Sequence, residues 1–385
     1  MISDKYNIRE RNEAMILKAI IDKGKISRAN LAKLTKLNKA SVSSITKDLI
    51  EKNLILENGI GIASSVGGRK PVLLEFNPKN SALISIDVGI NYIKGIITYL
   101  DGTEIHWYEE ENISITKKNV ISYINKVIKH LRNNCSLKIN GLTVGIHGVV
   151  KNNQIKFTPY YDLTEFDLLD QLLNYYSFPI YIENEANLVA LGEYCFNLES
   201  ENLIGISIHS GIGAGIVVDG LLQKGVYGQA GEIGHTILYP NGLKCPCGNN
   251  GCFEQYASTL ALLKDINKKQ SSKIITLQEI IDEYEDGNEN VINALHKNTL
   301  LLSIGINNII NTLNPETIVI NNLIYNKIPQ LLQLIKNNIV GKFSKNINIQ
   351  SGDLQEKSIV MGGIALACQQ YLRISKLKFL NSSRS

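Results

Sequence analysis

The first fifth of the chain carries an apolar pattern with the period of short helices. Gly24 ends the first of these helices, and Ser27 then stands as an N-cap before a second helix over residues 28–34. After a short turn, Asn38 is placed to cap a third helix over residues 39–52. The pattern therefore predicts a three-helix unit. The apolar positions of its first helix recur at helical spacing: Ala14, Leu17, Ile20 and Ile21.

The third predicted helix has two different faces. Val42, Ile45 and Leu49 share one face, which we expect to pack inward. Short side chains on the other face would allow close approach to base edges in a major groove, and lysines would reach the phosphates. We therefore predict that this face binds DNA, together with Arg28 at the start of the second helix. The face consists of Lys39, Ala40, Ser41, Ser44 and Lys47.

Two further apolar runs, over residues 54–57 and 72–76, enclose the segment GIGIASSVGGRKP. They predict a β-hairpin whose basic tip, with Arg69 and Lys70, lies along the DNA backbone or in a minor groove. Residues 1–76 hold 14 Lys and Arg against 8 Asp and Glu, a net charge of +6, whereas the rest of the chain has −2. A basic head on a neutral body is typical of polyanion binding. The alternative is a small helical bundle with a flexible linker and solvated lysines.

Two similar segments in the rest of the chain predict a repeated α/β unit. Residues 81–102 contain a strand that ends at Asp87, a turn at Gly89 and a returning strand. Residues 203–220 repeat this pattern, and glycine in a tight β-turn is the alternative explanation for both segments. Their order is characteristic of a duplicated ribonuclease-H-like fold with a cleft between two lobes. Three glycines of the second segment would let backbone amides approach a phosphate: Gly211, Gly213 and Gly215.

One strand end is predicted to supply polar groups to this cleft. The segment YIENEANLVALGEY at 181–194 indicates an apolar strand that ends at Glu183, Asn184 and Glu185, with a helix that begins near Ala186. Side chains at such strand ends point into the cleft of an open α/β sheet. The amide of Asn184 donates and accepts hydrogen bonds and Glu185 accepts them, so both suit sugar hydroxyls. The alternative is helix capping by the two residues, which is compatible with ligand contact.

The chain's most specific motif is GEIGH at 231–235 followed by CPCGNNGCFE at 245–254. Its imidazole and three thiolates form the ligand set of a closed, tetrahedral zinc site, which we expect to be structural because no ligand position is open to water. Glu232 and Glu254 flank the ligands and are well placed to accept hydrogen bonds from a polyol. The alternative is a cluster without metal. The predicted ligands are His235, Cys245, Cys247 and Cys252.

The length of 385 residues predicts two or three domains, and a hydrophobic content of 44% is ample for folded cores. No run of eighteen apolar residues exists, so we expect no membrane span. The polar segment MISDKYNIRERNE is not expected to act as a signal peptide. We expect a reducing cytoplasm, with the three remaining cysteines as buried small apolar residues: Cys135, Cys195 and Cys368.

These motifs resemble those of the ROK family of bacterial sugar kinases and sugar-responsive repressors, over nearly the whole chain. The kinases lack the helix-turn-helix, so the chain is most similar to the repressors, and among them to the xylose-responsive group of Gram-positive bacteria. The resemblance implies an α/β fold with a winged helix-turn-helix over residues 1–78. It implies an actin-like, ribonuclease-H-like body with lobes over 79–196 and 197–385 and a zinc knot in the second. We expect the C-terminal helix to return to the first lobe.

The resemblance also implies a function. We expect a homodimer or higher homo-oligomer that represses xylose-utilisation genes by binding operator DNA. Xylose or a related sugar would release it, and structural zinc would be its cofactor. The implied sugar contacts are Asn184, Glu185, Glu232, His235 and Glu254.

Departures from the kinase pattern indicate that the chain is not an enzyme. Glu185 stands where the kinases have an Asp as general base, and the longer side chain displaces the carboxylate. The first phosphate loop, DxGGTK in the kinases, reads DVGINY over residues 87–92. His209 and Ser210 alter the second loop, and His147 alters the cleft turn. Two alternatives remain: a ROK sugar kinase with a DNA-binding head, and a scaffold that binds a membrane transporter subunit.

Overall fold

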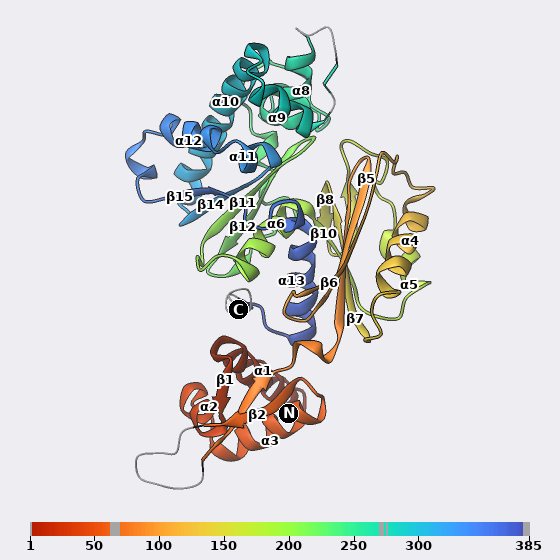
Figure 1. The fold of residues 1–385 in the computed structure, drawn as a ribbon, viewed down its shortest axis with the longest axis vertical. Helices are drawn as coiled ribbons and strands as arrows, with labels where there is room; N and C mark the ends of the chain where they lie inside the picture. Colours follow the sequence, from red (N-terminus) through yellow and green to blue (C-terminus); the bar gives the residue numbers. More distant parts are fainter. Residues whose placement is uncertain (1, 62–69, 269–272, 275, 380–385) are drawn as a thin grey trace.

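The computed structural model describes residues 2–61, 70–268, 273–274 and 276–379. Figure 1 shows a small N-terminal unit, which we call the head, next to a larger body. Within the body, two sheets lie on either side of a central pair of helices (Figure 1). The last described residues lie close to the junction between head and body (Figure 1).

Three helices and a three-stranded sheet, in the order β1-β3-β2, form the head. The two predicted caps are confirmed, since Ser27 Oγ accepts from the backbone of Asn30 and Asn38 Oδ1 accepts from that of Ser41. The first helix begins earlier than predicted, because its exposed turn at 8–11 needs no apolar stripe. The elements are α1 (Ile2–Lys23), β1 (Lys25–Ser27), α2 (Arg28–Thr35), α3 (Lys39–Glu51), β2 (Ile55–Ile60) and β3 (Val72–Phe76).

The first lobe of the body contains a five-stranded sheet in the order β10-β7-β4-β5-β6. Its central strand β4 is buried along its whole length, which accounts for its near-continuous apolar run. Two helices cover the outer face (Figure 1). The elements are β4 (Ala82–Val88), β5 (Tyr92–Tyr99), β6 (Glu104–Glu111), α4 (Val120–Arg132), β7 (Ile139–Ile146), β8 (Val149–Lys151), β9 (Gln154–Phe157), α5 (Leu168–Leu173) and β10 (Ile180–Asn184).

The second lobe repeats this strand order, as β13-β12-β11-β14-β15. In both sheets an antiparallel three-stranded meander is followed by two parallel strands, so the predicted duplication is confirmed. The elements are β11 (Leu203–Ile208), β12 (Ile212–Val218), β13 (Leu221–Leu222), α7 (Glu254–Ala257), α8 (Thr259–Asn267), α9 (Leu277–Glu285), α10 (Glu289–Leu313), β14 (Thr317–Asn321), α11 (Leu323–Lys327), α12 (Pro329–Asn338) and β15 (Asn348–Ser351).

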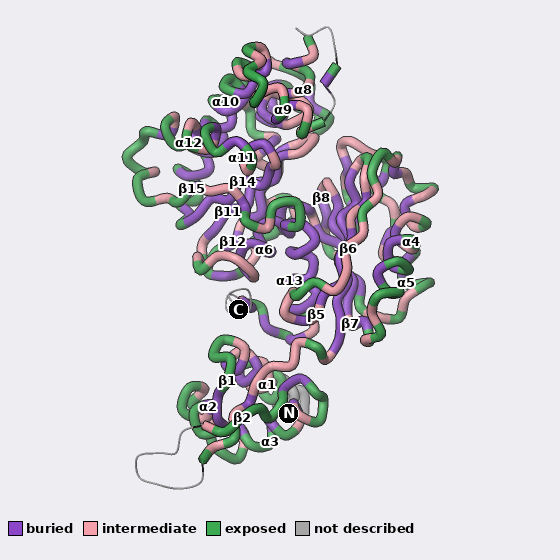
Figure 2. Tube along the Cα trace, in the orientation of Figure 1, coloured by how far each residue is buried: buried purple, intermediate pink, exposed green. Residues whose placement is uncertain are grey.

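Two buried helices, α6 (Glu185–Phe196) and α13 (Ser358–Leu372), cross between the lobes. Figure 2 shows that both are buried along most of their length. They cross closely at two glycines, because a Cβ atom on Gly362 would lie 1.8 Å from the carbonyl oxygen of Leu188 and one on Gly192 would lie 2.9 Å from the Gly362 nitrogen. Helix α13 also packs on β7 and β4, so the C-terminal helix belongs to the first lobe. Helix α6 ends at Phe196, which packs against the hydrophobic cluster that also contains residues of the head.

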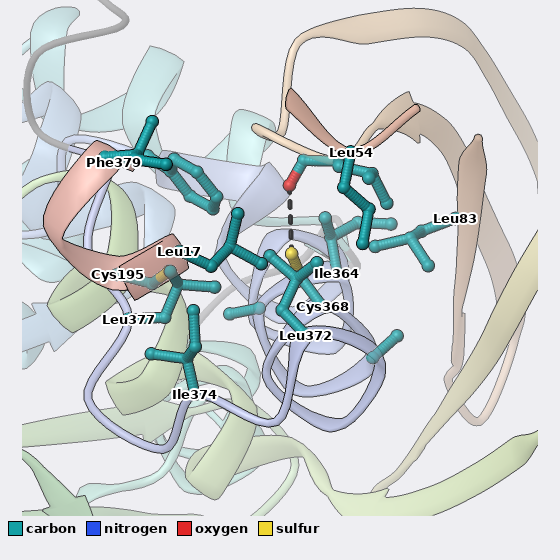
Figure 3. Close-up of a cluster of buried hydrophobic side chains, with 14 of the residues drawn as sticks. Leu17, Leu54, Leu83, Cys195, Ile364, Cys368, Leu372, Ile374, Leu377 and Phe379 are labelled. Carbon is teal, nitrogen blue, oxygen red and sulfur yellow. Dashed lines mark hydrogen bonds between the residues drawn. The ribbon is translucent and has the colours of Figure 1, made fainter. Parts of the chain in front are cut away.

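The head shares a hydrophobic core with the body. Leu17 of α1 and Leu54, which precedes β2, belong to the same buried cluster as the C-terminal residues Leu372, Leu377 and Phe379. Figure 3 shows these side chains converging at the junction. The head is therefore packed against the body through apolar contacts that come from both ends of the chain.

The three cysteines outside the segment at 245–254 form no disulfide bonds. Cys195 and Cys368 are fully buried, as predicted, and the Cys368 thiol donates to the carbonyl oxygen of Leu100 at 3.0 Å (Figure 3). Cys135 is only half-buried. Among the described helices, none combines the length and the apolar character needed to cross a membrane.

Candidate ligand and metal site

A cleft between the two lobes contains the residues that were expected to bind sugar. The ends of β7 and β10 contribute one wall, and the β11–β12 turn with the loops of the zinc motif contributes the other. The cleft brings together residues that are 70 positions apart in the chain, since Asn184 faces the same space as Glu254. All five expected residues line it: Asn184, Glu185, Glu232, His235 and Glu254.

Asn184 and Glu185 join β10 to α6 at the cleft. Asn184 Oδ1 accepts from the backbone N–H groups of Ala186 and Asn187, at 2.9 and 3.1 Å, so the predicted helix cap exists. Its Nδ2 donates to the Gly148 carbonyl and to Glu185 Oε2, both at 2.9 Å. The cap fixes both side chains at the cleft wall. Burial raises the pKa of Glu185 to about 7, so this carboxyl is partly protonated at neutral pH.

The opposite wall carries two carboxylates. Glu254 is 3% exposed, and the hydroxyl of Tyr160, from the first lobe, donates to its Oε1 at 2.8 Å. Glu232 is half-buried, and its Oε2 lies 3.6 Å from His235 Nε2. Burial raises the pKa of Glu232. Ionised carboxylates only accept hydrogen bonds, so this wall suits a ligand that donates several, as a polyol does.

The zinc-motif residues form one compact cluster. The Sγ atoms of Cys247 and Cys252 are 3.6 Å apart, and Cys245 Sγ lies 3.4 Å from His235 Nδ1. All four donor atoms lie within 4.8 Å of one another, so a single ion at about 2.0–2.3 Å from each could contact them all. The turn requires glycine at Gly251, where φ is +81° and a Cβ would lie 1.7 Å from the Tyr239 carbonyl oxygen. The donor set fits a structural zinc ion.

The first loop holds a cluster that the sequence did not predict. Asp87 Oδ1 lies 2.9 Å from His147 Nε2, and the hydroxyl of Tyr92 donates to Asp87 Oδ2 at 3.0 Å. Burial alone would lower the pKa of His147, but the charge of Asp87 raises it to about 8. The ring of Tyr92 covers Gly89, where an added Cβ would lie 2.4 Å from it. The loop is therefore filled by the protein's own side chains.

His209 reaches this cluster from the second lobe. Its ring stands edge-on to that of His147, with centroids 5.3 Å apart. Burial and the charge of His147 lower the pKa of His209 to about 4, so its imidazole is neutral. A signal for this cluster exists in the sequence, because Asp87 is the last residue but one of β4, His147 directly follows β7, and these strands are neighbours. The proximity of Asp87 to His147 can be inferred from the sequence only when the pairing of β4 with β7 is known.

The glycines of the second loop have a different role from the predicted approach to phosphate. Gly213 and Gly215 lie within β12, where a Cβ on Gly215 would be 2.2 Å from the carbonyl oxygen of Ala186 and one on Gly213 would be 3.0 Å from the Ala186 Cβ. Gly211 lies in the turn, where a Cβ would be 2.6 Å from Glu254 Oε2. These glycines let α6 and Glu254 approach the hairpin, which positions two walls of the cleft.

The head presents most of its predicted DNA-binding residues on one helix. Val42, Ile45 and Leu49 of α3 are buried, as predicted. Arg28 is held within the head, because its guanidinium pairs with Glu57 at 2.8 Å and donates to Thr46 Oγ1 at 3.1 Å. On the outer side of α3, Ser41 is half-buried, and the other four predicted residues are exposed: Lys39, Ala40, Ser44 and Lys47. Lys70 is also exposed, whereas Arg69 lies outside the described residues.

The fold and the site define a class: a two-lobed α/β protein of repeated strand order, with a carboxylate-rich cleft and a helical head. Residues 83–370 match the ROK family, and the chain belongs to that family. It is 36% identical to the xylose repressor of Bacillus spizizenii, over 98% of this chain and 100% of that protein. It is 32% identical to the xylose repressor of Staphylococcus xylosus, over 96% and 98%.

Solved structures of the family resemble the chain to different extents. A ROK family transcriptional regulator, a homologue of the Escherichia coli MLC protein, aligns with 96% of this chain and 98% of its own at a TM-score of 0.80 and 25% identity. A ROK glucokinase from Streptomyces griseus aligns with 75% of this chain and 100% of its own, at a TM-score of 0.69 and 22% identity. The regulator thus matches the head as well as the body, whereas the glucokinase leaves a quarter of the chain unmatched. The two relatives named above are xylose repressors, and the structure that also matches the head is a transcriptional regulator.

Proposed function

We propose that this protein is a transcriptional repressor of xylose-utilisation genes that xylose releases from operator DNA. The observation that carries the proposal is the match to xylose repressors over essentially the whole length of both chains. A match restricted to the body would fit the sugar kinases equally well. The head distinguishes the repressors from the sugar kinases, and the alignment with the xylose repressor includes it.

In this proposal the head is a winged helix-turn-helix. Helix α3 lies in a major groove, with Ala40, Ser41 and Ser44 near base edges and Lys39 and Lys47 near phosphates. The hairpin of β2 and β3 is the wing, and its Arg69 and Lys70 contact the DNA backbone. The internal pairing of Arg28 with Glu57 supports a role for Arg28 in holding α2 against the wing, in addition to any contact with phosphate.

The proposed inducer site is the cleft. Asn184, Glu185, Glu232, His235 and Glu254 bind the sugar, and His235 contributes a second time through the metal. Zinc on Nδ1 would leave Nε2 facing Glu232 and the cleft, where it can donate to a hydroxyl. The zinc ion, held by His235, Cys245, Cys247 and Cys252, would be structural and would keep Glu232 and Glu254 in place.

Release of DNA requires that the sugar binds one arrangement of the lobes more tightly than another. Two heads in a homodimer match half-sites that are about 34–36 Å apart, or a multiple of that spacing. A small rotation of each head therefore breaks the match. We propose that sugar binding closes the cleft and produces this rotation, in a protein that acts in the cytoplasm.

A sugar kinase with a DNA-binding head is the second candidate, favoured by the shared fold of the ROK kinases. Two observations weigh against it. The first loop is filled by the side chain of Tyr92, which binds Asp87. Glu185 Oε2 accepts from Asn184 at the position proposed for the kinase base. Both features oppose the approach of a nucleotide phosphate to a sugar hydroxyl.

The test measures thermal stabilisation of the zinc-loaded protein across a panel of free pentoses and hexoses. Xylose at a hundred times its dissociation constant should add about 2.7 kcal/mol to the stability. Glu232→Gln should still bind DNA but need more xylose for release, because a lost acceptor costs roughly 1–3 kcal/mol. Tight binding of a different sugar, with none of xylose, would show that the inducer is misassigned.

A further inference from the structure

His209 lies in the turn between β11 and β12, at the cleft, and its ring nitrogen Nε2 is buried without a hydrogen-bond partner within the described part of the chain. A buried polar atom without a partner typically costs about 1–3 kcal/mol. Such atoms are retained where a ligand or a change of conformation satisfies them.

The position of the His209 ring is fixed from both lobes. Its backbone N–H donates to the Gly211 carbonyl, and its own carbonyl accepts from the backbone of Thr259, both at 3.0 Å. From the first lobe, His147 stands against the ring, and His147 is itself held by Asp87 and Tyr92. The backbone of His209 is therefore anchored in the second lobe, and its ring packs against His147 of the first lobe.

The cleft has many hydrogen-bond acceptors and few free donors, and the His209 ring can supply a further donor. Its carboxylates accept hydrogen bonds, and the amide N–H groups of Asn184 already donate to Gly148 and Glu185. A sugar hydroxyl both donates and accepts, so a bound sugar with several hydroxyls requires donors in addition to the one proposed on His235. The imidazole of His209 is neutral, with one donating and one accepting nitrogen.

We propose that His209 is a further sugar-binding residue, and that its imidazole forms a hydrogen bond with one hydroxyl of the bound sugar. His147 and Asp87 act as positioning residues that hold the ring at the cleft. This inference rests on the proposed function, since it names an additional contact of the same inducer site. It gives the cluster in the first loop a use in sugar recognition.

The first experiment compares His209→Ala with the wild type by calorimetry, with D-xylose, D-glucose and N-acetylglucosamine as probes. The variant should bind the sugar that the wild type prefers about 10- to 100-fold more weakly. His209→Asn should recover part of the loss, because an amide also donates and accepts. His296→Ala is the matched control, since His296 is exposed on α10, away from the cleft, and should bind like the wild type.

A second measurement separates direct contact from a structural role. Monodeoxy analogues of the preferred sugar are bound to wild type and His209→Ala in a double-mutant cycle. Removal of one particular hydroxyl should weaken binding of the sugar to the wild type. The same removal should weaken binding to His209→Ala only slightly, because the partner of that hydroxyl is already absent. Full additivity for every analogue, or equal binding of the sugar by the folded variant, overturns the inference while the proposed function stands. A wild type that binds none of the three sugars overturns both.

A second inference comes from a different feature, the C-terminal segment after α13. The Phe379 ring stacks on Phe76 of β3 and on Phe196 of α6, with centroids 6.0 and 5.9 Å apart. Its backbone N–H donates to the Cys195 carbonyl at 2.7 Å. Phe379 is 6% exposed, so it is packed from both sides. One side chain therefore joins the last turn of α6 to the sheet of the head.

The same helix begins at the cleft. Glu185 is the first residue of α6 and Phe196 the last, so the helix spans about 18 Å from the proposed sugar site to the segment. Arg373 adds an ion pair with Glu10 of α1 at the other side of the junction. A displacement of α6 on closure of the cleft would move Phe379 and, through it, the head.

We infer that the segment over residues 373–379 transmits sugar binding to the head. This also rests on the proposed function, because it concerns the regulation of DNA release. The energy of transmission is a coupling free energy, which appears equally as weaker DNA binding with sugar and weaker sugar binding with DNA.

The experiment measures both affinities for the full-length protein, with D-xylose and a duplex that the wild type selects from random sequence. Phe379→Ala should bind each ligand alone with near-normal affinity, but the factor by which xylose weakens DNA binding should fall at least fivefold. Phe343→Ala, at a side chain that is 78% exposed, is the control. Phe379→Leu replaces the alanine variant if that fails to fold. An unchanged factor in a folded variant contradicts the inference, whereas loss of release by xylose in the wild type contradicts the proposed function.

Discussion

At the scale of single residues, the cleft combines groups whose ionisation is set by their neighbours. Asp87 is almost fully buried, and burial would raise its pKa, but the charge and hydrogen bond of His147 outweigh this and lower it. The pair therefore exists as carboxylate and imidazolium near neutral pH. Its stabilising effect depends on both charges, so it disappears when either partner titrates.

A pH dependence of stability follows from His147. Its pKa is about 8 in the folded protein against 6.5 in the unfolded chain, so the stabilisation is fully present below about pH 6.5 and is lost as the pH rises through 8. The difference corresponds to about 2 kcal/mol. The wild type should lose stability between pH 7 and 8.5, and His147→Gln should lose less, as measured by chemical denaturation. Parallel curves for the two proteins would show that the pair is not ionised as described.

At the scale of elements, short segments place the chemistry. The loop from Cys245 to Cys252 turns tightly enough to bring three thiols to His235, and α7 follows it directly with Glu254 at its first position. The one-turn 3-10 helix η2 (Ile233–His235) follows Glu232 on the other side. The proposed metal ligands and the proposed sugar ligands thus share two segments, and neither set can shift alone.

Loss of one thiol should therefore affect both functions. Cys247→Ser should contain little zinc and should no longer respond to xylose, because the carboxylates beside the ligands lose their support. Zinc content is measured by atomic emission and the response by release of DNA. Cys135→Ser, at a half-buried cysteine outside the cluster, should behave like the wild type. A metal-free Cys247→Ser protein with a normal sugar response would contradict a structural role for the metal.

Helix α3 should separate base reading from phosphate binding. Ser44→Ala should change the sequence preference of the full-length protein, because the proposed function places this residue at base edges. Lys47→Ala should weaken binding to all sequences and reduce the slope of log affinity against log salt by about one. Lys129→Ala on α4 is the control for loss of positive charge outside the head. Mobility shifts over a salt series test this, and equal effects of Ser44→Ala on all sequences would argue against base reading.

Features that depend on residues close together in the sequence could be predicted, whereas those that depend on residues far apart in the sequence could not. The caps at Ser27 and Asn38 are set by neighbours within three residues, and the local pattern was sufficient to find them. The zinc motif is also local. The contact of Asp87 with His147 depends on the pairing of β4 with β7. Leu17 and Phe379 belong to one buried cluster although they are more than 350 positions apart. Sequence patterns alone do not specify such pairings.

At the scale of the whole molecule, two lobes of repeated strand order enclose a cleft to which both contribute residues. The glucokinase with glucose and AMPPNP shares the fold of the body at a TM-score of 0.69. In this chain His147 of one lobe contacts His209 of the other, and both line the cleft. The two lobes therefore meet through these side chains at the cleft.

No phosphoryl transfer is therefore expected. General-base catalysis typically contributes about 100- to 10,000-fold, and the altered position of Glu185 removes part of that. The filled first loop removes phosphate positioning, and both losses act on the same transition state. Radiolabelled ATP incubated with the protein and with xylose or glucose should give no sugar phosphate above background. Many turnovers per protein molecule would favour the kinase instead.

The core shared by head and body limits how such proteins can be recombined. Leu17 and Leu54 of the head belong to the same buried cluster as Leu377 and Phe379, which lie far along the chain. An isolated head would expose this apolar surface, so its DNA binding is best studied in the full-length protein. A chimaera that takes its head from a different repressor would also need that repressor's C-terminal segment. The natural unit of exchange in this architecture is thus two separate stretches of sequence, one from each end.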